Sequence, residues 1–328
     1  HDDKLVLFEP PTAYLTKTQQ ANGTRFGANA IFNGENRKSG AMISFVINKP
    51  DSETKAQEQS ESKDGESEEK SDKKDLVKKD SLILTIYDSQ QRLIRTLSYK
   101  VPKDDGINRI YWGLDEKGVK KPNRKPDKSK KEPAGVKVLP GEYKLLLKYA
   151  DITDSTQITV NYDPRIQISE EVLEEQYNLL KSIEAKTDLA YRGVERLKES
   201  CEIAKGLKKQ AEKIDKDQYA EFIGKSDSIC KEINGLLDDM LGKEDKRQGI
   251  TATKSPTTIS YLDKARSYSN ALMSSPGATE DQLVKNSFEK IDGVMAKINS
   301  FYSKEWVEYQ TLAEKQKLSP FKTYEALK

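Results

Sequence analysis

The chain has 328 residues, of which 35% are hydrophobic and 34% charged, and its formal net charge is +2. This length is enough for two ordinary cores, at roughly 100–200 residues per domain. The near balance of charge excludes a global field that would attract nucleic acid or an anionic membrane. No run of about 18 apolar residues is present that could span a bilayer.

Residues 1–163 alternate apolar and polar residues with the period of β-strands, in short segments bounded by Gly, Pro, Asn and Asp. A tight hairpin is predicted at Asp88–Gln91. No helical period separates the segments, so an antiparallel immunoglobulin-like sandwich is expected. The predicted strands are Lys4–Glu9, Phe26–Phe32, Ala41–Asn48, Ser81–Asp88, Leu93–Val101, Asn108–Leu114, Glu142–Tyr149 and Thr156–Tyr162.

Two low-complexity segments interrupt the predicted sandwich. Residues 51–80 are almost entirely Ser, Glu, Asp, Lys and Gln, and cannot bury enough apolar surface to offset the entropy of ordering. Residues 117–137 are rich in Lys and Pro and nearly lack the aromatic residues that stack on bases. We expect both to be disordered, charged insertions, and we expect no nucleic-acid partner.

The period changes after residue 163, and residues 164–328 are predicted to form an all-α antiparallel bundle. Ser169 is typical of a helix N-cap, and the acidic residues Glu170 and Glu171 follow in the first turn. The apolar spacing predicts helices at residues 169–214, 217–241, 258–274 and 279–317.

The residue types needed for most side-chain catalysis are missing. The single histidine is His1, which excludes Ser-His-Asp and Cys-His catalysis and HExxH zinc sites. There is no glycine-rich phosphate loop and no EF-hand loop, and most carboxylates have the spacing of solvated helix faces. We therefore expect no catalytic residue, no cofactor and no metal site.

Cys201 and Cys230 are the two cysteines. Both lie on the apolar seams, at equal distances from a turn predicted near Asp215, so antiparallel packing would place them at one level. Helix axes 8–10 Å apart are marginal for the Cα separation of a disulfide. A disulfide and two buried thiols therefore remain open as alternatives.

Aromatic residues raise a second alternative, a carbohydrate-binding module. Trp112 is expected in the sandwich core and Trp306 in packing between helices or domains. A sugar-binding face would require exposed, coplanar rings. The candidates on the predicted sandwich are Tyr14, Phe26, Tyr87, Tyr99 and Tyr111.

Two motifs resemble FlgD-type immunoglobulin-like domains: Gly106-Ile107-Asn108-Arg109-Ile110-Tyr111-Trp112 and Leu139-Pro140-Gly141-Glu142-Tyr143-Lys144-Leu145. The junction Asp163-Pro164-Arg165, with the helix opening at Ser169, is similar to the C-terminal regions of secreted bacterial BNR-repeat proteins. Those proteins have sortilin-like β-propellers and are often labelled glycosyl hydrolases. The resemblance covers nearly the whole chain in order of elements. Trp112-Gly113-Leu114-Asp115 departs from the Trp-Asp-Leu-Arg usual in that family.

The resemblance implies a FlgD- or fibronectin III-like sandwich, followed by a bundle, in a secreted, periplasmic or cell-surface bacterial protein. Leu5-Val6-Leu7-Phe8 resembles the strand that leaves the last propeller blade, so the chain is expected to be part of a longer polypeptide. Its partner would be its own upstream β-propeller. The region itself would be a non-catalytic accessory or scaffold, with binding of carbohydrate or of another protein as alternatives.

Overall fold

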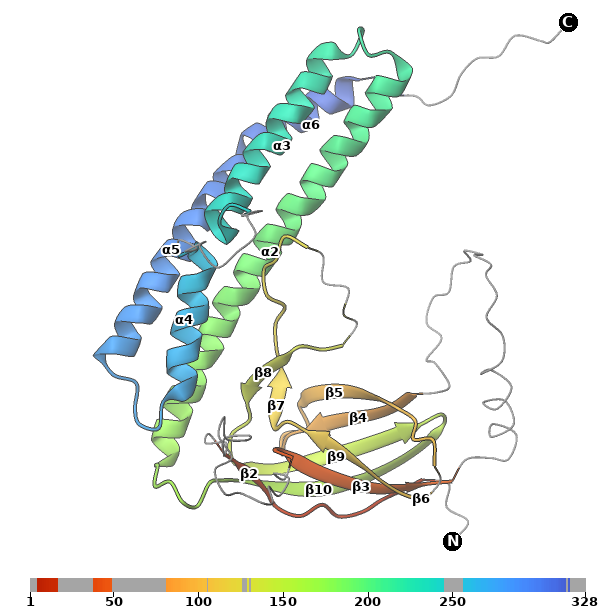
Figure 1. Cartoon of the computed structure of the whole chain (residues 1–328), viewed down its shortest axis with the longest axis vertical. Coiled ribbons are helices and arrows are strands. Elements are labelled where there is room, and N and C mark those ends of the chain that lie inside the picture. The colour runs from red at the N-terminus through yellow and green to blue at the C-terminus, as the bar shows by residue number, and fades with distance from the viewer. Residues whose placement is uncertain are drawn as a thin grey trace, which may run out of the picture. The chain divides into compact units, whose positions relative to one another are not determined.

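The computed structural model of the chain describes residues 5–16, 38–48, 81–104, 106–125, 129, 131–244, 256–316 and 318. Strands occupy the N-terminal half and helices the C-terminal half (Figure 1), as the sequence predicts. By proximity of its residues the chain divides into two units. The β unit comprises residues 1–118 and 129–177, and the helical unit comprises residues 119–128 and 178–328.

The strands of the β unit form two larger sheets and one short hairpin. One sheet has the order β1-β3-β6, the other has the order β2-β10-β9-β4-β5, and β7 pairs with β8. Neighbouring strands are antiparallel except β2 and β10, which are parallel. The bounds are β1 Leu5–Leu7, β2 Ala13–Leu15, β3 Ala41–Ile47, β4 Ser81–Tyr87, β5 Leu93–Lys100, β6 Gly106–Trp112, β7 Asp115–Lys117, β8 Ala134–Lys137, β9 Gly141–Tyr149 and β10 Ile152–Tyr162.

Period-two alternation turns one face of each sheet inward. In β3 and β4 every second side chain is buried, which is what half-buried strands require. Side chains from both sheets meet in one hydrophobic cluster, and fully burying each Leu or Ile there stabilises the fold by about 1.5–3 kcal/mol. Its fully buried members include Trp112, Phe45, Ile43, Ile47, Leu82, Leu84, Ile86, Leu145, Leu147 and Val160.

Gly40 lies where the backbone before β3 closely approaches the backbone at the end of β6. Its φ is +101°, a conformation that L-residues rarely adopt, and a Cβ added there would lie 2.3 Å from the carbonyl oxygen of Trp112. Only glycine therefore fits where the chain begins β3 beside the end of β6. The hairpin predicted at Asp88–Gln91 is confirmed, since the Gln91 amide donates to the Asp88 carbonyl oxygen at 3.0 Å.

Some of the β structure differs from the prediction. The strand predicted at Phe26–Phe32 and the insertion at residues 51–80 lie outside the described residues. Residues 117–137 were expected to be a disordered insertion, yet β7 ends at Lys117 and β8 occupies Ala134–Lys137. These strands are held by polar contacts with β5, described below, and not by apolar alternation.

The helices begin and end close to the predicted positions. They are α2 Glu170–Ile214, α3 Ala220–Leu241, α4 Thr258–Ala271, α5 Ala278–Ser303 and α6 Glu305–Lys315. The Ser169 hydroxyl accepts the Val172 amide at 3.4 Å, as expected for the N-cap of α2. The predicted helix at residues 279–317 is divided, because Lys304 adopts φ −124°, ψ −80° between α5 and α6.

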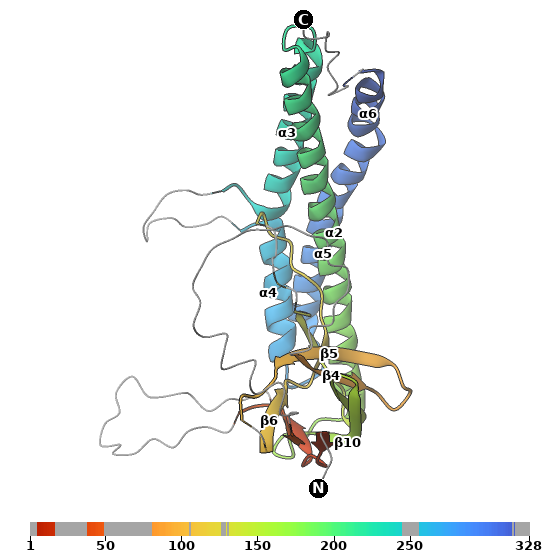
Figure 2. The same ribbon diagram turned by 90° about the vertical axis from the view of Figure 1, so that its right-hand side faces the viewer.

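The helical unit has its own hydrophobic cluster, formed by side chains of all these helices. Figures 1 and 2 show α3 and α4 lying end to end beside α2. Helix α5 runs along α4 and along part of α3. The Tyr309 ring of α6 stacks on Phe222 of α3 at 5.7 Å between centroids. The Tyr309 hydroxyl lies 2.9 Å from the Ser226 hydroxyl, which itself donates to the Phe222 carbonyl oxygen, so this buried polar pair is satisfied.

Candidate functional site

No ready metal or membrane site is found in the part of the chain that the structure describes. Within those ranges, no three His, Cys, Asp or Glu side chains gather closely enough to hold a metal ion. None of the described helices combines the length and the hydropathy needed to cross a bilayer. His1 lies outside the described residues.

The candidate sugar-binding aromatics do not form one platform. Tyr14 and Tyr87 lie on strands of the five-stranded sheet and alternate with its buried side chains, so both point outward. Tyr99, on β5 of the same sheet, packs against the hydrophobic core. Tyr111 lies on β6 of the other sheet, and Phe26 is outside the described residues.

The polar contacts of these rings are structural. The Tyr99 hydroxyl donates to the Tyr111 carbonyl oxygen at 2.7 Å, which connects the two sheets. Burial raises the pKa of Tyr99 to about 12. The Tyr111 ring lies 5.2 Å from the Lys38 ammonium. Of the candidate rings that the structure describes, only Tyr14 and Tyr87 therefore point outward from one sheet.

Both tryptophans are packing residues, as predicted. Trp112 is fully buried, its ring meets Tyr143 edge-on at 5.4 Å, and its indole N–H donates to the Asp115 carbonyl oxygen at 3.0 Å. Trp306 is buried beside Phe301 and Tyr309, at 6.2 and 5.5 Å between ring centroids. Each unit thus contains one tryptophan.

A buried ion pair that the sequence did not predict joins β5 to the β7–β8 hairpin. The Arg95 guanidinium pairs with the Asp115 carboxylate and also donates to the carbonyl oxygens of Glu116 and Glu132, at 2.9 and 3.3 Å. The Glu132 carboxylate accepts the Thr96 amide at 3.0 Å. These contacts explain how a highly charged hairpin becomes ordered, although twenty residues separate Arg95 from Asp115.

Two further buried carboxylates hold turns of the β unit. Asp88 accepts the amides of Gln90 and Arg92, each at 2.9 Å. Burial alone would raise the pKa of Asp88, but these hydrogen bonds and the Arg92 guanidinium outweigh it and lower the pKa. Asp163 accepts the side chain and the amide of Arg165, and these hydrogen bonds lower the pKa of Asp163 to about 2.

A segment between β7 and β8 belongs to the helical unit. In this segment, residues 119–125, Pro122 is buried. Arg124 donates to the Gly242 carbonyl oxygen at 2.6 Å and pairs with Asp238 near the C-terminus of α3. Lys121 pairs with Asp263 of α4 at 2.7 Å. Basic side chains favour helix C-termini, yet no pattern in this Lys- and Pro-rich stretch predicts that it packs on helices.

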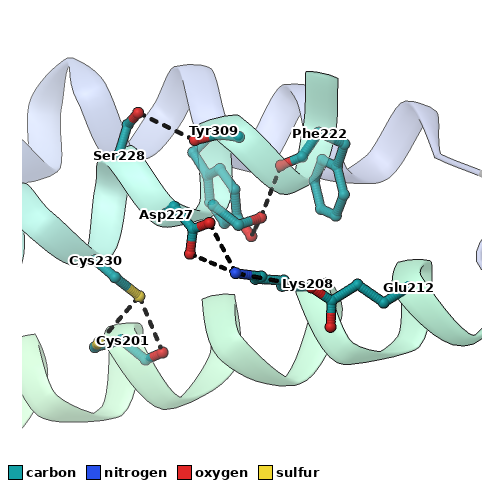
Figure 3. Close-up of polar contacts among 10 residues, drawn as sticks. Cys201, Lys208, Glu212, Phe222, Asp227, Ser228, Cys230 and Tyr309 are labelled. Carbon is teal, nitrogen blue, oxygen red and sulfur yellow. Dashed lines mark hydrogen bonds and ion pairs between the residues drawn. The ribbon is translucent and has the colours of Figure 1, made fainter. Parts of the chain in front are cut away.

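Cys201 of α2 and Cys230 of α3 form a thiol pair (Figure 3). Of the sites described, this pair has the side chains best suited to a chemical reaction. Their sulfurs are 3.0 Å apart, and both residues are free cysteines. The Cys230 thiol also approaches the Cys201 carbonyl oxygen at 3.5 Å. Equal spacing from the turn after α2 was the signal in the sequence, and the two sulfurs do lie at one level.

Charged residues lie close to the thiol pair. The Lys205 amine lies beside Cys201, whose sulfur is the main cause of a raised Lys205 pKa. Burial, with the neighbouring Cys201, raises the pKa of the Cys230 thiol. The Lys208 ammonium, on the turn-proximal side of the pair, bridges to both Asp227 carboxylate oxygens at 2.7 Å (Figure 3).

This arrangement suits thiol–disulfide chemistry better than hydrolysis. Two sulfurs face one another at 3.0 Å, as an internal disulfide requires, and no histidine is present among the described residues to act as a general base. Comparisons with protein-family models, with curated proteins and with solved structures each find no match to this chain.

Proposed function

We propose that the chain is a non-catalytic accessory or scaffold region of an exported protein, built from an immunoglobulin-like sandwich and an antiparallel helical bundle. The sandwich would mediate docking to neighbouring domains, and the bundle would serve as a spacer or as a surface for protein interaction. An upstream β-propeller of the sortilin-like, BNR-repeat type is the proposed partner, and this part of the proposal rests on the sequence resemblance.

The strand order supports an immunoglobulin-like interpretation of the β unit. Its N-terminal segment is shared between sheets, since β1 pairs with β3 in one and β2 runs parallel to β10 in the other. β10, β9, β4 and β5 then follow in antiparallel order. Immunoglobulin-like domains distribute their strands between two sheets over a common core in this manner.

The helical unit is proposed to be an antiparallel bundle. Two cross-helix contacts, Lys208 with Asp227 and Cys201 with Cys230, fix α3 in an antiparallel register on α2. Lys186 of α2 pairs with Asp292 of α5 at 2.7 Å, and Lys297 of α5 pairs with Asp239 of α3 at 2.6 Å. Ion pairs around an apolar seam are typical of bundle surfaces.

The non-catalytic proposal rests on one observation, the bonding partners of the buried carboxylates. In the described chain they are Asp88, Asp115, Asp163 and Glu184, and each one bonds to a basic side chain. Three of those partners lie within four residues of the carboxylate, as expected of groups that hold turns and helices. A catalytic acid would instead face a substrate cleft with its proton free to move.

Carbohydrate binding is the weaker alternative, because only Tyr14 and Tyr87 remain as outward rings on one sheet. Titration calorimetry with soluble oligosaccharides separates the two proposals. The scaffold proposal predicts no binding heat from the parent chain. Saturable binding that the double variant Tyr14→Ala/Tyr87→Ala abolishes would favour the carbohydrate-binding module.

The proposal that this chain is part of a longer exported protein is tested on the native polypeptide. An antibody against this chain should detect an exported product much longer than 328 residues, whose upstream part binds this chain when the two are purified separately. A free cytoplasmic polypeptide of this length would contradict the proposal, and so would an upstream part that does not bind it.

A further inference from the structure

We propose that Cys201 and Cys230 are a modification site, oxidised to an intramolecular disulfide that links α2 to α3 in compartments containing exchangeable disulfides. The inference goes beyond the proposed scaffold role and does not depend on it, since the bond is tested on the purified chain. The two residues are the only cysteines of the chain, so no alternative internal pairing competes.

The sulfurs already lie close to bonding distance. Their separation of 3.0 Å exceeds the length of a disulfide bond, about 2.05 Å, by only about 1 Å. Adjacent helices can close such a gap with small changes in side-chain torsion, whereas a larger gap would require backbone movement. The two thiols therefore need little rearrangement in order to join.

Contacts on both sides hold the thiol pair in register. Toward the turn, Lys208 of α2 bridges to Asp227 of α3 at 2.7 Å. On the other helix faces, the Ser200 hydroxyl lies 2.9 Å from the Tyr302 hydroxyl of α5, and Ser226 lies 2.9 Å from Tyr309 of α6. The Lys208–Asp227 pair joins α2 to α3 directly, while the two hydroxyl contacts fix α2 on α5 and α3 on α6, so each of the two helices is held in place near its cysteine.

The burial of the two sulfurs suggests an order of events. Cys230 is the more exposed of the two, while Cys201 is buried with the Lys205 ammonium beside it. Cys230, as its thiolate, would attack a small or protein disulfide RSSR, releasing one RSH and leaving a mixed disulfide; because burial raises the pKa of Cys230, this first attack is the slow step. The Cys201 sulfur would then attack the Cys230 sulfur and release the second RSH. One S–S bond is broken and one formed, and the two electrons and two protons of the thiols leave in the two RSH molecules.

The bond would close a loop between residues 29 positions apart. Constraining a loop of that size in the unfolded chain should raise the unfolding midpoint of the helical unit by roughly 5–10 °C. The midpoint of the β unit should not change, because the closed loop lies outside it.

The test incubates the purified chain with oxidised glutathione to equilibrium, then counts thiols under denaturing conditions and measures the intact mass. The proposal predicts that two thiols fall to none, that the monomer loses 2 Da, and that the helical midpoint rises; reduction should restore all three values. Two thiols remaining, a stable glutathione adduct, or a disulfide-linked dimer would each overturn it.

A matched control moves one sulfur without changing the number of cysteines. In the double variant Ser228→Cys/Cys230→Ser, the thiol sits on the exposed face of α3, where the Ser228 hydroxyl bonds to the Gly224 carbonyl oxygen at 3.0 Å. We expect this variant to keep two thiols or to form glutathione adducts, with no 2-Da loss. Equal internal oxidation of the control and the parent would overturn the inference, since positioning by the helices would then have no role.

Discussion

The β unit and the helical unit are both folded from a highly charged chain, but different interactions stabilise them. In the β unit, single buried carboxylates hold turns and edges: Asp88 in the β4–β5 hairpin, Asp115 at β7 and Asp163 after β10. In the helical unit the seam is apolar, and most ion pairs lie at its partly exposed surface. Individual polar residues should therefore contribute most to stability in the β unit.

The largest effect is expected from the core residue Trp112. Trp112→Ala should lower the free energy of unfolding of the β unit by about 4 kcal/mol, because it leaves a large cavity and orphans the Asp115 carbonyl oxygen. Fluorescence of the remaining Trp306 reports the helical unit, which should unfold at its original denaturant concentration. Equal losses in both units would show that they do not have separate cores.

Arg95→Met should have the next largest effect. It leaves the buried Asp115 carboxylate unpaired, which costs about 3 kcal/mol of β-unit stability. The double variant Arg95→Met/Asp115→Leu removes both charges and should recover part of that loss, as measured by denaturant unfolding followed through Trp112. A double variant less stable than the single one would contradict the pairing.

Arg124→Ala removes a polar contact of the helical unit. The guanidinium is partly exposed, so losing its bonds to Asp238 and to the Gly242 carbonyl oxygen should destabilise the helical unit by only about 1 kcal/mol. Thermal unfolding at low and high salt provides the measurement. Lys125→Ala, at an exposed neighbouring position, is the matched control and should have no effect.

Asp163→Asn should produce the smallest change, a loss of β-unit stability at neutral pH that disappears in strong acid. The folded pKa of Asp163, about 2, is lower than the ordinary value of 3.8 because Arg165 donates hydrogen bonds to the carboxylate. The resulting stabilisation is complete above about pH 4 and is lost as the pH falls through about 2. The variant should therefore lose less β-unit stability than the parent across this window, while Asp151→Asn, at an exposed turn, should behave as the parent does.

Local periodicity was enough to predict most elements. Alternation located β3, β4 and β9, and the 3–4 apolar spacing located α2 and α3 to within a few residues. The same spacing placed Cys201 and Cys230 at one level. These predictions succeed because each pattern reports burial along a single element.

Elements held by distant partners could not be predicted in this way. β2 has three residues and is ordered by its parallel pairing with β10, about 147 residues away. β7 has the sequence Asp-Glu-Lys and is ordered through Arg95. The interruption at Lys304 contains no proline or glycine, and the apolar seam continues across it. The sequence pattern therefore predicts one continuous helix there. In each case the deciding interaction is long-range or conformational and leaves no local pattern.

Buried polar groups stabilise the unit in which they lie. The most direct test of this claim is denaturant unfolding of Arg95→Met in two single-tryptophan backgrounds, Trp306→Phe and Trp112→Phe. We expect a large shift of the transition reported by Trp112 and no shift of the one reported by Trp306. Equal shifts of both transitions, or no shift of either, would contradict it.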